Sequence, residues 1–167
     1  MKIQLPTFKE LHINLKKLLW EHKPKTFEEW KNLASSLFCA KLGAYLKNNS
    51  ANTKDNFHKI YQIMFYYGFI NFRRELELRD LLLKNDYSVE VANMYQDAIL
   101  GIDLFAYKNN NLFLLQVKAK DSEEYDFKRI NEIALTKAAT PVLAYKFENQ
   151  WYFKTTNGDS VINLLEF

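Results

Sequence analysis

The most restrictive feature of this sequence is a pair of short apolar runs joined by an asparagine-rich turn. Residues 101–107 read GIDLFAY and residues 112–118 read LFLLQVK, with KNNN between them. Two runs of strand length separated by turn-forming residues predict a β-hairpin. The runs are interrupted by Asp103, Gln116 and Lys118, which an apolar core does not require. These polar residues indicate that the hairpin carries a functional site.

Helical periodicity dominates the chain before this hairpin. Apolar residues recur at helical spacing over 8–20, and Thr26 with Glu29 forms a capping-box pattern that opens a second helix over 26–47. A polar break at 48–56 precedes a third helical segment over 57–87. The first part of the chain is thus predicted to be a helical region joined by a polar turn.

After residue 87 the sequence pattern changes from helical periodicity to short runs typical of strands. A strand is expected over 87–91, the hairpin follows, and residues 125–140 again show a helical pattern. Residues 141–147 and 151–155 flank a three-residue turn and predict a second hairpin. The predicted order is helix, three strands, helix, two strands.

Composition is typical of a globular protein. Of 167 residues, 48% are apolar and 26% are charged, which is enough apolar content for one domain with an appendage. No window approaches the roughly 18 continuous apolar residues of a membrane-spanning helix. The single cysteine, Cys39, has no internal disulfide partner, and no signal-peptide pattern is present. We expect a cytoplasmic protein that does not enter a membrane.

Charge is unevenly distributed along the chain. Residues 1–60 carry eleven lysines against five acids, a net +6, whereas residues 61–167 carry twelve basic residues against fifteen acids, a net −3. A basic segment suits a polyanion-binding surface, because lysines near phosphates release condensed counterions. A solvated helical surface explains the same lysines equally well.

Three polar residues of the hairpin suit phosphodiester hydrolysis. Gln116 and Lys118 share one face of their strand, and the hairpin brings the segment of Asp103 alongside them. The register that decides whether they meet is not fixed by sequence. Carboxylate and amide oxygens bind Mg²⁺ or Mn²⁺, and a lysine orients the attacking water and offsets negative charge.

At these residues the chain resembles the PD-(D/E)XK nuclease superfamily. Ile102-Asp103 stands where the superfamily has Pro-Asp, residues 116–118 (Gln-Val-Lys) match its Glu-x-Lys half, and residues 72–89 resemble the helix that carries an extra acid. The sequence of residues 127–153 resembles archaeal Holliday-junction resolvases. The pattern "GID…QVK", residues 101–103 and 116–118, resembles the Mrr-like restriction branch. Gln116 in place of glutamate removes one negative charge and should weaken metal binding.

The resemblance implies a fold and a domain organisation. The fold class is α/β (α+β), with the restriction-endonuclease-like central mixed β-sheet flanked by helices. The nuclease core would span residues 66–167. Residues 1–65 would form a helical N-terminal region that grips DNA or supports oligomerisation.

The resemblance also implies roles for individual residues. Asp103 is the expected central metal ligand, Gln116 an assisting ligand and Lys118 the group that positions water. Glu75 is preferred over Glu77 as the further acidic ligand. Glu90 and Asp97 remain alternative ligands, and the expected contacts to nucleic-acid phosphates are Arg73, Arg74 and Lys120.

We therefore expect a Mg²⁺- or Mn²⁺-dependent DNA endonuclease of restriction, homing or junction-resolving type, with RNA the less favoured substrate. Cutting of two strands would require a homodimer or higher assembly. The rival interpretation is a catalytically decayed nuclease fold, marked by Gln116, that binds nucleic acid without cutting it. A third is a structural α+β protein unrelated to nucleic acid.

Overall fold

The computed structural model describes residues 4–51 and 53–166. The chain divides into two compact units, Met1–Arg73 and Arg74–Phe167. The division falls inside the long helix α6 (Tyr67–Lys84). No helix within the described residues is long and apolar enough to cross a membrane.

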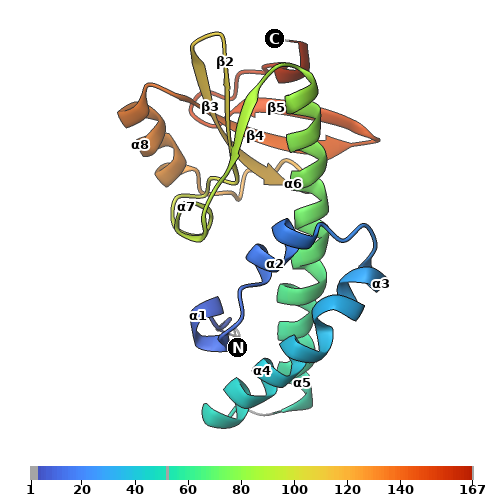
Figure 1. Cartoon of the computed structure of the whole chain (residues 1–167). Helices are drawn as coiled ribbons and strands as arrows, with labels where there is room; N and C mark the ends of the chain where they lie inside the picture. Colours follow the sequence, from blue (N-terminus) through green and yellow to red (C-terminus); the bar gives the residue numbers. More distant parts are fainter. Residues whose placement is uncertain (1–3, 52, 167) are drawn as a thin grey trace. The chain divides into compact units, whose positions relative to one another are not determined.

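The first unit is helical, as predicted. Its helices are α1 (Phe8–Leu11), α2 (Leu15–His22), α3 (Phe27–Trp30), α4 (Ser36–Asn48), α5 (Lys54–Ile60) and the start of α6, with π-helical segments η1 (Lys31–Ser35) and η2 (Tyr61–Tyr66) (Figure 1). Side-chain oxygens of Thr7, Asn14, Thr26 and Thr53 accept backbone hydrogen bonds at the helix starts. These caps satisfy N–H groups that have no partner within the helix.

One expectation for this unit is wrong. Residues 8–20 do not form a continuous helix, because His12 adopts a left-handed conformation that ends α1 and Asn14 caps a new helix. Apolar periodicity continues through this break, since Leu11 and Leu15 are both buried. Periodicity reports which face is buried and cannot by itself show that the backbone is continuous.

Stacked aromatic rings form the centre of the first unit. The ring centroids of Trp30 and Phe65 lie 4.8 Å apart, and those of Phe38 and Phe65 lie 5.4 Å apart. The Trp30 indole donates a hydrogen bond of 3.1 Å to the Phe65 carbonyl, which lies in π-helical η2. The buried indole N–H is thereby satisfied, as a buried polar group requires.

The second unit is built on a five-stranded mixed sheet of order β1-β2-β3-β4-β5. The strands are β1 (Ser88–Val91), β2 (Leu104–Lys108), β3 (Asn111–Lys118), β4 (Thr140–Phe147) and β5 (Gln150–Thr155). Only β3 and β4 pair in parallel, and α8 (Lys128–Lys137) connects them, as a parallel pair requires. The unit also contains α7 (Met94–Ala98) and the 3-10 turn η3 (Leu164–Glu166).

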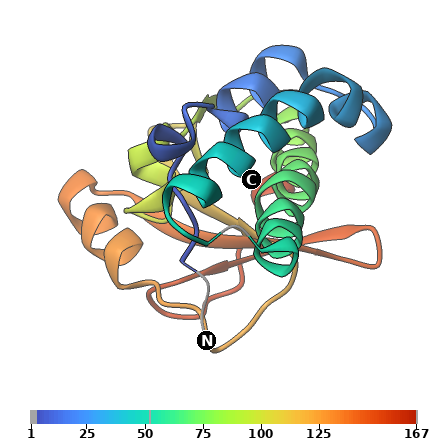
Figure 2. The same cartoon turned by 90° about the horizontal axis from the view of Figure 1, so that it is seen from below.

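Helices cover both faces of this sheet, so the predicted α+β class, a mixed sheet flanked by helices, is confirmed. Leu78 and Leu82 of α6 join the core cluster on one face, and Ile130 and Ala134 of α8 join the cluster on the other (Figure 1 and Figure 2). Alternate residues of β3 divide between the two: Leu115 packs toward α6 and Leu114 toward α8.

Both predicted hairpins are present. Their turns are Asn109-Asn110 and Glu148-Asn149, and all four residues have positive φ angles between 50° and 64°. Two consecutive positive φ values match the twist of the flanking strands, and asparagine tolerates this conformation better than most residues. The turn chemistry therefore fixes the register of each hairpin.

The short helix α7 was not predicted. It begins with a capping box in which Asn93 accepts from the Gln96 N–H and the Gln96 side chain accepts from the Asn93 N–H. This pattern is readable in the sequence, but the apolar residues that follow it mark no core-facing side, since Met94, Tyr95 and Ile99 are exposed in the structure.

We expect Leu82→Ala to lower the free energy of unfolding of the second unit by about 2–5 kcal/mol, because it leaves a cavity between α6 and the sheet. Its neighbour Leu83 is 42% exposed, so Leu83→Ala should change that free energy by less than about 0.5 kcal/mol. Urea unfolding followed by circular dichroism measures both. Equal losses in the two variants would contradict this orientation of α6.

Candidate active site

Asp103 is held rigidly where β2 begins. Its backbone N–H donates to the Leu115 carbonyl over 2.8 Å, and its carbonyl accepts from the Ala92 N–H over 3.0 Å. Its side chain is buried, and Oδ2 accepts a 2.7 Å hydrogen bond from the Val117 N–H. The backbone of β3 thus orients the carboxylate.

The hairpin register places this carboxylate beside Gln116. The β2–β3 ladder ends at the pair Leu104–Leu115. Asp103 comes directly before this pair and therefore lies next to the Gln116-Val117 segment of β3. Lys118 lies two residues beyond Gln116 and projects from the same face of the strand. The structure therefore brings together the Asp, Gln and Lys of the sequence pattern in one region of the second unit.

Two further carboxylates approach Asp103. Burial raises the pKa of Asp103 well above its usual range, and the charges of Glu75 on α6 and Asp97 on α7 raise it further. A side-chain hydrogen bond with Asp97 acts in the same direction, while the Val117 N–H lowers the pKa. The half-buried Glu75 and Asp97 therefore approach the buried Asp103 from two helices, and the charges of the three acids oppose one another.

Gln116 presents an unsatisfied oxygen to this region. Within the described part of the chain, its Oε1 is buried and accepts no hydrogen bond. A Cβ added at Gly101 would lie 3.3 Å from Gln116 Nε2, and Gly101 itself has φ +72°. Any side chain at residue 101 would therefore be strained and would press on the Gln116 amide.

The Lys118 ammonium is oriented by an aromatic ring. Its Nζ lies 5.4 Å from the ring centroid of Tyr125, and the Tyr125 hydroxyl donates to the Lys120 carbonyl over 2.8 Å. Sequence reasoning missed Tyr125, because the loop after β3 carries no pattern that indicates where its ring lies.

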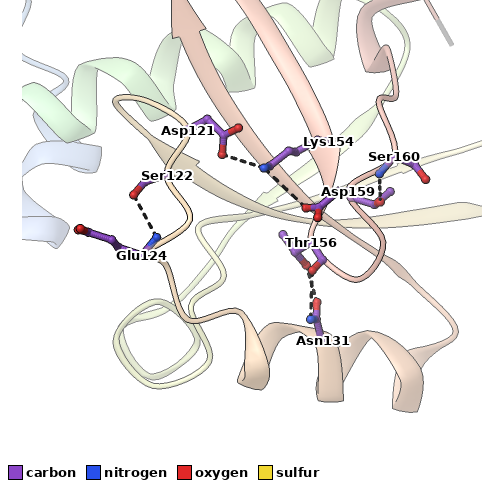
Figure 3. Close-up of polar contacts among 9 residues, drawn as sticks. Asp121, Ser122, Glu124, Asn131, Lys154, Thr156, Asp159 and Ser160 are labelled. Carbon is purple, nitrogen blue, oxygen red and sulfur yellow. Dashed lines mark hydrogen bonds and ion pairs between the residues drawn. The ribbon is translucent and has the colours of Figure 1, made fainter.

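That loop is anchored to β5 through Lys154. Lys154 Nζ lies 2.9 Å from Asp121 Oδ1 and 3.6 Å from Asp159 Oδ1 (Figure 3). Within the loop, Ser122 Oγ accepts from the Glu124 N–H. Hydrogen bonds between Asn131 of α8 and Thr156 lie nearby in the same view. Lys154 also went unnoticed in the sequence, because its contact with Asp121 depends on strand order.

The other candidate residues occupy different places. Glu77 pairs with Lys146 over 2.7 Å, and Glu90 is exposed on β1. Arg73, in the first unit, donates to the Pro24 carbonyl over 3.4 Å. Arg74 lies close enough to Tyr125 for its charge to lower the pKa of that hydroxyl, and Lys120 is exposed.

The donor set fits a hard divalent cation that keeps part of its water shell. Among residues 4–51 and 53–166, no three acidic, histidine or cysteine side chains form a ready-made metal site. Mg²⁺ commonly binds through one or two carboxylates and retains several waters. The residues present that could hold such a cation are Asp103, Gln116 through its unpaired oxygen, and one of the nearby acids.

The fold resembles the Holliday junction resolvase Hjc of the archaeal hyperthermophile Archaeoglobus fulgidus, with a TM-score of 0.44 and 15% sequence identity over 51% of this chain and 75% of that one. No protein-family model matches the sequence, and no curated protein does.

We expect Asp103→Asn to stabilise the metal-free protein at neutral pH. A raised carboxyl pKa means that the unfolded chain loses this proton first, so the free energy of unfolding falls as pH rises above the ordinary aspartate pKa. Asparagine stays neutral, still accepts from Val117 and adds a donor toward Asp97.

Thermal unfolding in EDTA between pH 4 and pH 8 measures this effect. The melting temperature of Asp103→Asn should exceed that of the wild type by at least about 2 °C at pH 8, roughly 1 kcal/mol for this chain length, and the gap should close toward pH 4. Glu123→Gln, at an exposed loop residue, is the control and should show no gap. A less stable Asp103→Asn at pH 8 would contradict the burial of an opposed charge.

A second prediction concerns the loop at residues 119–127. Lys154→Met keeps the aliphatic stem but removes both ion pairs, so amide hydrogen exchange in this loop should become faster by about threefold or more. Lys146 lies in the same β4–β5 hairpin and forms a comparable ion pair with Glu77 of α6. Lys146→Met breaks that pair and should leave hydrogen exchange in the loop unchanged. Equal exchange in both variants would show that Lys154 does not anchor the loop.

Proposed function

We propose that this chain is a divalent-cation-dependent nuclease that hydrolyses phosphodiester bonds in DNA. The observation that carries the proposal is the convergence of a buried Asp103, an unpaired Gln116 oxygen and Lys118 on one hairpin, with Glu75 and Asp97 approaching from two helices. A structural core gains nothing from gathering three acids where their charges repel. A cation site makes use of this arrangement.

In this proposal Asp103 and Gln116 hold the cation, and Glu75 or Asp97 completes the protein ligands. The bound cation would supply Lewis acidity and make a nearby water more acidic. The backbone N–H of Val117 keeps the Asp103 carboxylate in place, and the Gly101 backbone leaves room for the Gln116 amide. The protein ligands are thus oriented before a cation arrives.

Lys118 would act on the phosphate and the attacking water. Its ammonium donates hydrogen bonds and offsets the negative charge that develops as the water oxygen bonds to phosphorus and one ester oxygen leaves. The ammonium lies over the Tyr125 ring, 5.4 Å from its centroid. Arg74 and Lys120 would contact neighbouring phosphates of the DNA strand.

DNA binding and assembly complete the proposal. The net +6 of residues 1–60 supports a role of the helical region in holding the DNA backbone or in joining two copies. One site cuts one strand, so a homodimer or higher assembly would allow both strands of a duplex to be cut.

Cleavage assays test this function directly. On a panel of linear, supercoiled, single-stranded and four-way-junction DNA, the wild type should cut only with Mg²⁺ or Mn²⁺ present. Asp103→Asn and Lys118→Met should each lower the rate by about 10²-fold or more, the usual effect of removing one group that stabilises transition-state charge. Lys108→Met is the matched control, because Lys108 also lies over a tyrosine ring, at 5.2 Å from Tyr87.

Thermal unfolding with and without Mn²⁺ separates binding of the cation from catalysis. The wild type should gain stability on adding Mn²⁺, and Asp103→Asn should not. Metal-dependent cutting that survives in both variants would reject this site. DNA binding without cutting of any panel member would instead support the decayed-nuclease interpretation.

A further inference from the structure

Part of one sheet face continues from the candidate site as an aromatic surface. The parallel register of β3 with β4 and the antiparallel register of β4 with β5 align Lys118 with Tyr145 and Tyr152 in one row. Residues directly opposite one another project from the same face. The next row, Phe147 with Gln150, extends this face to the hairpin tip. We call Tyr145, Phe147 and Tyr152 the aromatic strip.

Two rings of the strip stack on each other, and two of its three rings are exposed. Tyr145 and Tyr152 stack with centroids 5.6 Å apart and an interplanar angle of 19°. Tyr152 is 38% exposed and Phe147 is 61% exposed. The half-buried Tyr145 thus supports the exposed ring of Tyr152 beside Lys118, and this ring is a surface on which a flat ligand can lie.

The same face is covered at its other end. Leu112 and Leu114 of β3 pack in the core cluster that contains Ile130 and Ala134 of α8. Beside the candidate site the face is still buried at Leu143, which pairs with Gln116, and it becomes exposed only further along, at Tyr152 and Phe147. The face therefore passes from a helix-covered core, through the candidate site, to an exposed surface toward the tip of the β4–β5 hairpin.

Resting on the nuclease function proposed above, we propose that the substrate carries an unpaired nucleotide next to the scissile phosphate, and that this base stacks on the aromatic strip. Aromatic side chains bind single-stranded nucleic acid by stacking, which tolerates any base sequence. In an intact duplex both faces of each base are already stacked, so the strip has nothing to bind. A single strand, flap, loop or open junction presents a free base.

Charge on this part of the sheet supports an anionic polymer as the occupant. None of the six residues that the β4–β5 register places on this face is acidic: Leu143, Tyr145, Phe147, Gln150, Tyr152 and Lys154. Lys154 is paired with Asp121 and Asp159, so the cation next to the strip that is offered to a phosphate is Lys118. Lys118 stands at the inner end of the strip, beside Tyr145. A base on the strip thus places its phosphate toward the ammonium that the hydrolysis requires.

Binding without metal provides a test that does not depend on cleavage. Fluorescence anisotropy in EDTA would compare a labelled 12-nucleotide single strand with a blunt duplex of the same sequence. Tyr152→Leu keeps an apolar side chain but removes the ring, and should weaken single-strand binding about fivefold or more while changing duplex affinity less than twofold. Tyr152→Trp should retain single-strand affinity.

The control is Tyr107→Leu. Tyr107 is 46% exposed on β2 of the same sheet and its hydroxyl bonds to Asn110 at the turn, away from Lys118. This variant should bind both DNAs as the wild type does. A 2-aminopurine base in the single strand should show a fluorescence change on binding wild type that is absent with Tyr152→Leu.

The outcomes separate this proposal from the proposed function. If Tyr152→Leu binds single strands with wild-type affinity, or loses affinity for single strands and duplex equally, the strip does not bind a base. If metal-dependent cutting still requires Asp103 and Lys118, the nuclease function stands without it. If Tyr152→Leu leaves DNA binding intact but lowers the sedimentation coefficient, the occupant is a second copy of the chain and the proposal is overturned.

Discussion

The register of the β2–β3 hairpin is the constraint on which the candidate site depends. Two asparagines with positive φ make the turn, and the ladder that follows ends at Leu104 and Leu115. That end point sets Asp103 beside Val117, whose backbone N–H then fixes the carboxylate. Gln116 and Lys118 follow from the same register. A local turn preference thus determines where acids, amide and ammonium meet.

Burying Asp103 places stability and function in opposition. The folded chain encloses a carboxyl whose pKa is raised by burial and by Glu75 and Asp97, so its ionised form opposes folding. The packed layers on both sides of the sheet supply the stability that tolerates this. Such local unfavourable electrostatics are common where a site is organised for a ligand that is not part of the chain.

Much of the fold followed from local patterns, and less of the site did. The two hairpins, the helix between β3 and β4 and the helical first region were predictable because turn residues and apolar periodicity are local signals. The break at His12–Asn14 and the helix α7 were not, since neither changes the apolar pattern. The approach of Asp97, the Tyr125 ring and the Lys154 bridge depend on register and loop path, which no short stretch of sequence encodes.

The two-residue turn at Asn109-Asn110 also limits how such a chain can diverge. One added residue in this turn would shift β2 by one position against β3 and turn Leu104 and Ala106 out of the core layer that they share with α6. An insertion can persist only if it adds residues in pairs or is absorbed by a β-bulge. Length variation among descendants of this sequence should therefore collect in the loop at residues 119–127, while the hairpin keeps the separation between Asp103 and Gln116.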